Sequence, residues 1–269
     1  MESFHHTHPS YMELTKWTYP HPELTVGLTT RIGGTGEPPF DSFNLAWHVP
    51  DQQDTIRRNR ETLAQLLDFP LESWVGGEQV HKTEIKRVTK KDLGKGATSR
   101  ETAIPDCDGL ITNEPNLLLT AFYADCVPLF FFDPVNNWIG IAHAGWRGTV
   151  ASMGPKMIDA LEKHGADKRH IRVAVGPSIG GDAYEVDDAV VDQIPNQFRS
   201  EPTVIEQGSG KYLLSLQQMH KELLMQAGIK EDHIEVSEYC TYQNSHLFFS
   251  HRRDEGKTGR MLGFIGFKK

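Results

Sequence analysis

The most apolar stretch of the chain, LLLTAFYADCVPLFFF at residues 117–132, strongly limits the folds that this sequence can adopt. It is too short and too mixed in polarity for a membrane-spanning helix, and it suits a strand that is buried on both faces. A turn sequence, DPVNN, follows at 133–137, and residues 138–142 are a second apolar stretch. The two stretches are therefore predicted to pair as a hairpin, in which Asp125 and Cys126 interrupt the apolar character.

Apolar strands and amphipathic helices also follow one another through the rest of the chain. Apolar residues that recur on one face predict helices at 54–67, 149–164 and 215–227. Further strands are predicted at 24–30, 78–88, 171–175, 234–239, 247–250 and 261–267. No repeat or linker divides the sequence, so we predict one α+β catalytic domain over residues 1–269, with mixed sheets layered with helices and a loosely ordered N-terminal extension at 1–20.

Composition argues against several classes of partner. The formal net charge of -8 gives no general attraction to nucleic acid. The first thirty residues have no basic segment followed by an apolar one, and no later run is long enough to span a bilayer, so we expect a cytoplasmic protein without a membrane partner. Cys107, Cys126 and Cys240 are too few and too scattered for a disulfide framework, which leaves each of them available for another role.

Cys126 and His143 lie at nearly equal distances from the predicted turn, so the hairpin would bring their side chains together. His81, near a predicted strand end, is a candidate third ligand. One thiolate and two neutral imidazoles suit zinc, although Cu2+ can occupy the same ligands, and three protein ligands leave a fourth position open. The sequence thus predicts a catalytic Zn2+ site at His81, Cys126 and His143.

Other interpretations of the same residues stay open at this point. A lone cysteine in an apolar strand is usually a small buried hydrophobe, and a lone histidine is usually a hydrogen-bonded core residue. A cysteine hydrolase would use Cys126 as nucleophile with His143 or His81 as base. A structural zinc site in a binding protein would need a fourth ligand, which Cys107 or Cys240 would have to supply.

Several blocks of this sequence resemble the signature motifs of one bacterial family, which was long called polyphenol oxidase or laccase-domain proteins and was later assigned to the purine nucleoside phosphorylases. The most specific blocks are GEQVH (77–81), DCDGLIT (106–112), ADCVP (124–128) and HAGWRGT (143–149). Further matches are TTRIGG (29–34), FNL (43–45), NR (59–60), VGPSI (175–179), CT (240–241), FSHRR (249–253) and TGR (258–260). Two departures are Ser178, where the family often has cysteine, and His251, where tyrosine is common.

The resemblance implies a four-layer α/β/β/α sandwich and a catalytic metal bound by His81, Cys126 and His143. It also implies phosphorolysis of adenosine, inosine and S-methyl-5'-thioadenosine, so the expected partners are a purine nucleoside and phosphate. The family's older name implies copper and phenol oxidation as the alternative. The only His-x-His pair, at 6–8, lies in a polar segment, and a single site of this kind cannot store four electrons. No feature of the sequence determines the oligomeric state.

Zinc lowers the pKa of a bound water toward about 7, which is a physical route to adenosine deamination when a carboxylate shuttles protons. Asp125 is the nearest acidic candidate, and its alternative role is a structural hydrogen bond on the opposite face of the strand.

Four further residues are candidates for binding phosphate or ribose. Arg147 and Thr149 begin the helix that follows His143, where backbone N–H groups favour an anion. Arg31 offers a planar guanidinium on a glycine-containing loop, and Asn44 is a weaker candidate for the ribose hydroxyls.

Overall fold

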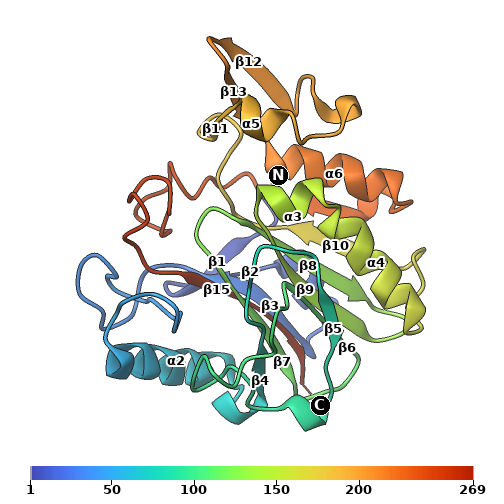
Figure 1. Cartoon of the computed structure of the whole chain (residues 1–269). Coiled ribbons are helices and arrows are strands. Elements are labelled where there is room, and N and C mark those ends of the chain that lie inside the picture. The colour runs from blue at the N-terminus through green and yellow to red at the C-terminus, as the bar shows by residue number, and fades with distance from the viewer. Residues whose placement is uncertain (1, 269) are drawn as a thin grey trace.

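The computed structural model describes residues 2–268 and contains two six-stranded sheets that pack face to face (Figure 1). Sheet I has the strand order β1 (His5–His8), β2 (Tyr11–Glu13), β3 (Leu24–Thr29), β15 (Met261–Phe267), β7 (Leu118–Tyr123), β4 (Trp74–Gly76). Sheet II has the order β14 (Ile234–Val236), β10 (Arg172–Val175), β8 (Val127–Asp133), β9 (Trp138–Ala144), β6 (Gly109–Thr112), β5 (Ile85–Arg87). Both sheets are mixed, because each combines antiparallel pairs with parallel pairs such as β4 with β7 and β10 with β14.

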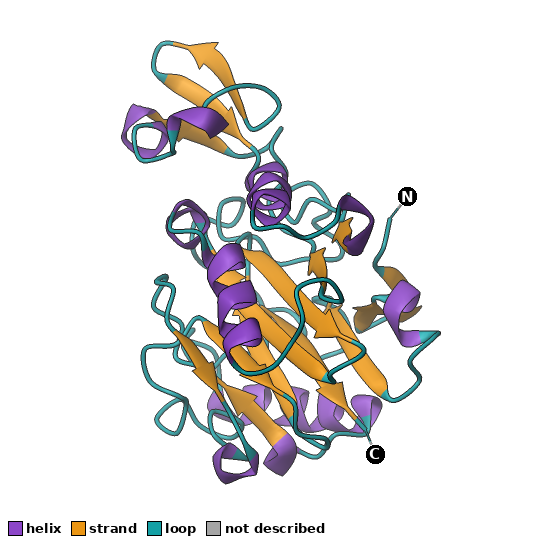
Figure 2. Cartoon of the chain, turned by 90° about the vertical axis from the view of Figure 1, so that its right-hand side faces the viewer, coloured by secondary structure: helices purple, strands orange, loops and turns teal. Residues whose placement is uncertain are grey.

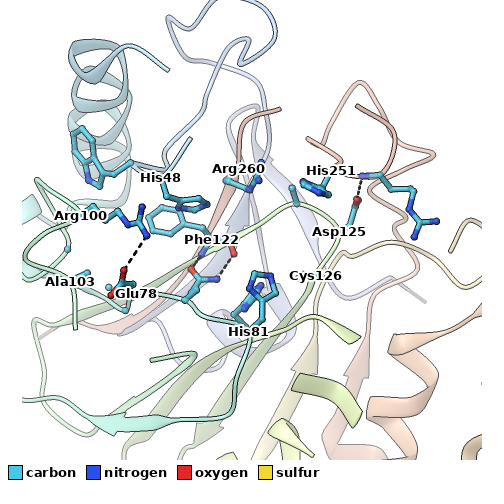
Figure 3. A pocket seen from close by; sticks show the side chains of 18 of the residues that line it. His48, Glu78, His81, Arg100, Ala103, Phe122, Asp125, Cys126, His251 and Arg260 are labelled. Carbon is cyan, nitrogen blue, oxygen red and sulfur yellow. Dashed lines mark hydrogen bonds and ion pairs between the residues drawn. The ribbon is translucent and has the colours of Figure 1, made fainter. Parts of the chain in front are cut away.

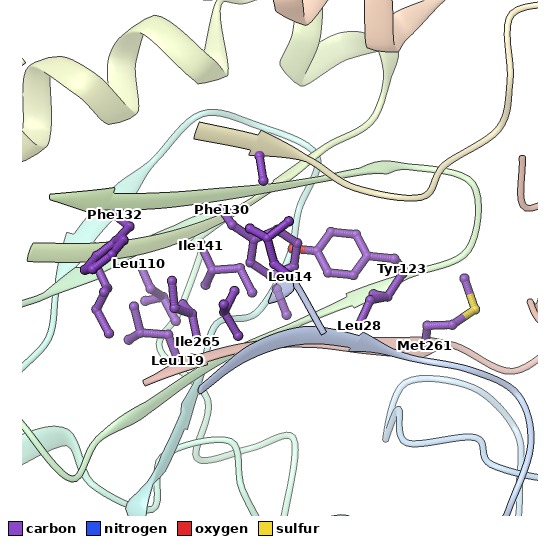
Figure 4. Close-up of a cluster of buried hydrophobic side chains, with 14 of the residues drawn as sticks. Leu14, Leu28, Leu110, Leu119, Tyr123, Phe130, Phe132, Ile141, Met261 and Ile265 are labelled. Carbon is purple, nitrogen blue, oxygen red and sulfur yellow. The ribbon is translucent and has the colours of Figure 1, made fainter. Parts of the chain in front are cut away.

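The space between the two sheets is filled by apolar side chains that both sheets contribute (Figure 4). Leu28, Leu119 and Ile265 come from sheet I, and Phe130 and Ile141 come from sheet II, and all five are at most 1% exposed. Strands β7, β8 and β9 are continuous apolar runs because each is buried on both faces, by the other sheet on one side and by helices or further core on the other.

Helices cover the outer face of each sheet (Figure 2). Helix α2 (Gln53–Leu67) packs Leu63 and Leu67 against sheet I, and α4 (Met153–Lys163) and α6 (Leu216–Gln226) pack against sheet II. The predicted four-layer α/β/β/α arrangement is therefore confirmed. The remaining helices are short: α1 (Thr15–Thr18), α3 (Trp146–Val150) and α5 (Asp188–Val191).

A third sheet projects from one end of the molecule, where Figures 1 and 2 both show it away from the two main sheets. It has three antiparallel strands in the order β11 (Glu185–Asp187), β13 (Lys211–Leu214), β12 (Val204–Gly208). The sequence analysis did not predict these strands, because two of them are largely exposed and lack an apolar face.

The predicted hairpin is confirmed, but the apolar stretch before its turn is two strands rather than one. Strand β8 pairs with β9 across the turn, with Phe130 opposite Ile141. Strand β7, in contrast, belongs to sheet I. Residues 124–126 carry the chain from one sheet to the other, so Asp125 and Cys126 lie at a crossing between sheets and not inside a strand.

The N-terminal segment differs from the prediction of a loosely ordered extension. Strands β1 and β2 form the edge of sheet I, and Phe4, Met12 and Leu14 are fully buried in the core between the sheets. The polar histidines of β1 suggested a solvent-exposed tail, but Phe4 before them and Met12 and Leu14 after them anchor the segment in the core.

Three other predicted elements differ in extent. Residues 78–84 are loop, and only β5 is a strand within 78–88. The helix at 149–164 is divided into α3 and α4 at Ser152, whose φ of 63° is left-handed. Residues 247–250 are buried but do not form a strand.

Candidate metal centre

His81, Cys126 and His143 converge at the crossing between the two sheets. Their ligand atoms all lie within 4.8 Å of one another, and they are the only such group of three found in residues 2–268. His143 is near the end of β9, opposite Pro128 of β8, so the hairpin places it beside Cys126, which directly precedes β8. The approach predicted from the hairpin is thus present, although Cys126 stands just outside the strand.

Asp108 fixes the positions of two of these ligands at once. Its Oδ1 accepts a hydrogen bond from His143 Nδ1 at 2.9 Å and another from the backbone N–H of His81 at 3.1 Å. Its Oδ2 accepts from the backbone N–H groups of Val80 and Lys82. With Nδ1 donating to the carboxylate, the Nε2 lone pair of His143 is free for a metal, which is a common arrangement around metal-binding histidines.

The backbone is strained at two positions of the centre. His81 has a φ of 60° and Asp125 a φ of 80°, in the left-handed region that costs a non-glycine residue about 1–3 kcal/mol. The Asp108 carboxylate offsets this cost at His81, because it binds three consecutive N–H groups of the turn. The turn therefore presents the His81 side chain toward Cys126 and His143.

Gly145 leaves room between two of the ligands. A Cβ at this position would lie 3.0 Å from Cys126 Sγ and 3.4 Å from His81 Cδ2. Only glycine, therefore, lets the start of α3 pass this close to the centre without displacing a ligand.

Cys126 and His143 shift each other's pKa toward the charged forms. Burial raises the pKa of the Cys126 thiol, but the charge of His143 and hydrogen bonds from His143 and His81 lower it more, so the net direction is downward. Burial likewise opposes ionisation of His143, while Cys126 and Asp108 together raise its pKa. A thiolate beside two imidazoles is a donor set that suits zinc and copper.

The three ligands form part of the wall of a cavity of about 440 Å³ (Figure 3). His81 is exposed, Cys126 is half-buried and His143 is buried, so the group opens to the cavity on one side. None of the other residues that line the cavity adds a fourth Cys, His, Asp or Glu atom to the group. The residues present therefore fit a metal with three protein ligands and one open position.

Substituting Asp108 with asparagine should weaken metal binding by about 10- to 100-fold while the protein stays folded, because the amide keeps the shape but not the charge. Competition with a chromophoric zinc chelator measures the affinity. The matched control is Asp106→Asn, which changes an exposed carboxylate two residues away. Equal affinities of the Asp108 variant and the unchanged protein would refute the positioning role of Asp108.

Asp125 lies beside the centre, but protein groups already occupy its carboxylate. Oδ1 accepts a hydrogen bond from Thr241 Oγ1 at 2.6 Å, and Oδ2 accepts from the backbone N–H of Arg252 at 2.7 Å. These contacts match the structural alternative considered from the sequence. The carboxylate ties the crossing to the C-terminal loops that close one side of the cavity.

Arg147 and Thr149 do not line the cavity. Arg147 is exposed and stacks on the ring of Trp146, with 4.3 Å from its Cζ to the ring centroid. Thr149 is fully buried, donates a hydrogen bond to Gly145 O and lies 2.9 Å from His220 Nε2. Both side chains of the predicted anion site are therefore directed elsewhere, because α3 begins beside the centre and runs away from it.

Arg31 and Asn44 also lie outside the cavity lining. The guanidinium of Arg31 donates to Asp41 O and Ser245 O and stacks on Phe249, so it joins two loops. Asn44 is fully buried. Its side-chain Nδ2 donates a hydrogen bond to Asp51 Oδ2, and its side-chain Oδ1 accepts one from the backbone N–H of Arg260.

Several residues of the site were not assigned from the sequence. Asp108 lies in the DCDGLIT block, but no role was predicted for it from the sequence. Its hydrogen bonds with His81 and His143 in the structure identify it as a positioning residue. His48, Arg100 and Arg260 line the cavity from three loops that are far apart in the chain. The TGR block was the available signal for Arg260, whereas none of the motifs contains His48 or Arg100. Of the two departures from the family pattern, His251 lines the cavity and Ser178 is buried behind it.

Comparisons with known proteins agree with this geometry. The family model described as "Multi-copper polyphenol oxidoreductase laccase" matches residues 25–268. The chain is 41% identical to "Purine nucleoside phosphorylase YlmD" of Bacillus subtilis over 268 residues, covering 98% of this chain and 96% of that protein. It is 45% identical to the protein of the same name from Geobacillus stearothermophilus over 251 residues, covering 92% and 91%.

The crystal structure of YlmD from Geobacillus stearothermophilus superposes on the whole chain with a TM-score of 0.94 and 42% sequence identity, and both chains are covered completely. Within residues 2–268, no helix combines the length and the apolar character needed to cross a membrane. The family match and the relatives both extend over nearly the whole chain, and the chain therefore belongs to the laccase-like multi-copper polyphenol oxidoreductase family.

Proposed function

We propose that this protein is a zinc-dependent purine nucleoside phosphorylase that acts on adenosine, inosine and S-methyl-5'-thioadenosine and also deaminates adenosine. The observation that carries the proposal is the group of His81, Cys126 and His143 in the wall of a cavity, with one side open. The names of the relatives from Bacillus subtilis and Geobacillus stearothermophilus, purine nucleoside phosphorylase in both cases, support the class of substrate.

The donor set favours zinc as the resident metal, with His81, Cys126 and His143 as the residues that would hold it. Bound zinc would supply a Lewis acid that polarises an oxygen or nitrogen of the substrate. Nδ1 of His143 donates a hydrogen bond to the Asp108 carboxylate, which would leave Nε2 free to hold the metal.

The cavity is suited to a nucleoside. Its volume of about 440 Å³ falls within the range of small-molecule sites, and the rings of Phe122, His48 and Tyr184 provide flat surfaces for a purine. In phosphorolysis a phosphate oxygen forms a bond to ribose C1' while the bond from C1' to the purine nitrogen breaks. The electron pair leaves with the base, which takes up a proton, and ribose 1-phosphate remains.

In the proposed deamination, a water oxygen forms a bond to C6 of the purine, the bond from C6 to the amino nitrogen breaks, and the nitrogen leaves as ammonia. Phosphate takes no part in this reaction. Asp125 was the candidate proton carrier, but both of its oxygens already accept hydrogen bonds from Thr241 and Arg252. In our proposal Asp125 shapes the wall of the cavity during this reaction.

Phenol oxidation with copper is the second candidate, and the family's description as a multi-copper polyphenol oxidoreductase favours it. The ligand set accepts copper as well as zinc. However, residues 2–268 offer only one such group of ligands, whereas oxidation of phenols by oxygen through four-electron chemistry needs several copper ions.

Metal-defined protein incubated with inosine should release hypoxanthine and ribose 1-phosphate only when phosphate is present. Adenosine without phosphate should give inosine. Chromatography of the products separates the two reactions, and the same assay with a phenol under air tests the oxidase. Phenol turnover by the copper form, with no nucleoside products from the zinc form, would replace our proposal with the oxidase.

A further inference from the structure

We propose that the part of the cavity around His48 is an oxyanion subsite, anchored by the guanidinium of Arg260. In the proposed phosphorolysis the anion is inorganic phosphate, and this identification alone rests on the proposed function. The subsite differs from the one expected from the sequence, which used Arg31, Arg147 and Thr149.

Arg260 offers the cavity a cation that has no carboxylate partner. Its Nη1 donates to the backbone oxygens of Thr258 and Gly259, which hold one edge of the guanidinium. Within residues 2–268, none of its other N–H groups has a protein acceptor within hydrogen-bond distance, and no carboxylate lies within ion-pair distance. Arg260 lines the cavity and lies beside His48 (Figure 3).

The backbone around Arg260 is held in place by Asn44. The Asn44 side-chain oxygen accepts hydrogen bonds from the N–H of Arg260 at 3.0 Å and from that of Ala46 at 3.2 Å. One buried amide therefore joins the segment that carries His48 to the segment that carries Arg260. A preorganised cation of this kind binds an anion without first losing side-chain freedom.

Arg60 adds a second positive charge behind the same wall. It is fully buried, its Nε and Nη1 donate to three backbone oxygens, and its Nη2 has no partner. It packs against the rings of Trp47 and Phe122, both at 5.0 Å and both lining the cavity. No carboxylate in the described part of the chain neutralises this charge.

Arg100 is the third arginine near His48, and it is the one with an acidic partner. Its Nη2 lies 3.2 Å from Glu78 Oε1 at the cavity edge, and its side chain is 55% exposed. Three guanidinium groups thus lie near His48, and of these only Arg100 forms an ion pair with a carboxylate. Asp125 and Cys126 also line the cavity and act on Arg260 through their charges, without an ion pair to it. The protein as a whole is negative, so this cluster of arginines is not a consequence of composition.

His48 behaves as a residue that lies in a positive environment. Burial first, and then the charges of Arg260 and Arg100, lower the pKa of His48 to about 4. The neutral ring keeps an N–H that can donate to an anion at neutral pH. A tetrahedral oxyanion here would accept from His48 and from the Arg260 fork, a geometry that a guanidinium matches well.

Inorganic phosphate titrated into the zinc-loaded protein, followed by isothermal calorimetry, tests the subsite without any reaction. Arg260→Gln should weaken phosphate binding by about 10- to 100-fold, the loss of one to two charge-assisted hydrogen bonds. Arg260→Lys should fall in between, because it keeps the charge but not the fork. Arg87→Gln is the matched control, since Arg87 is exposed and stacks on Trp138 away from the cavity.

Activity measurements then separate this inference from the proposed function. If inosine phosphorolysis occurs, Arg260→Gln should raise the KM for phosphate by a similar factor, whereas Arg87→Gln should leave the KM for phosphate unchanged. Unchanged phosphate affinity and KM in a folded Arg260→Gln protein would overturn the subsite, as would an unchanged protein that binds no phosphate. Phosphate binding that depends on Arg260 in a protein that cleaves no nucleoside would leave the subsite standing and refute the proposed function.

Discussion

Replacing Cys126 with alanine should remove the bound metal and lower nucleoside turnover by at least about 10³-fold. The substitution takes away the only thiolate of the group and leaves two imidazoles, which hold zinc far less tightly. Loss of a Lewis acid that contributes about 4 kcal/mol to the transition state corresponds to a factor of this size. Elemental analysis of the purified variant gives the metal content, and product chromatography gives the rate.

Cys107→Ser is the matched control for this prediction. Cys107 is buried, and its Sγ donates to Gly109 O at 2.9 Å, a contact that a serine hydroxyl reproduces. The control should keep one metal ion per chain and normal activity. Full metal content in the Cys126 variant, or loss of metal in the Cys107 variant, would contradict the three-ligand centre.

The second large effect is expected on stability. Arg60→Ala should lower the free energy of unfolding by about 3–5 kcal/mol, a large fraction of the total stability of a domain. The side chain is fully buried, and its removal leaves the backbone oxygens of Leu45, Gly96 and Ala97 without donors and creates a cavity between Trp47 and Trp74.

Urea unfolding of metal-free protein measures this effect separately from metal binding. Arg57→Ala on the exposed face of the same helix should change the free energy of unfolding by less than about 0.5 kcal/mol. Equal stabilities of the Arg60 and Arg57 variants would show that the buried contacts of Arg60 contribute little.

Much of the fold could be predicted from the sequence because its signals are local. The DPVNN turn between two apolar stretches predicted the β8–β9 hairpin, and the spacing of Leu63 and Leu67 with their polar neighbours predicted α2. The point at which the chain leaves sheet I for sheet II was not predicted, because a strand buried in either sheet has the same apolar pattern. Only the short break at Asp125 and Cys126 indicated it.

For the candidate site too, some residues could be predicted from local sequence signals and others could not. The hairpin register brought Cys126 and His143 together by geometry, and a family motif supplied His81. The environment of His48, formed by loops that are distant in sequence, has no periodicity that a sequence could reveal. Arg147 looked favourable because it follows His143 at a helix start, but the direction of a side chain on α3 depends on how that helix packs.

Because the metal centre lies where the chain crosses between the two sheets, its three ligands depend on both sheets being present. His81 follows β4 of one sheet, His143 lies near the end of β9 in the other, and Cys126 lies on the three-residue link between the sheets. No fragment that contains a single sheet with its helices holds all three donors. The smallest unit able to bind the ion is thus the complete pair of layers, and any shortened version of the protein must preserve both.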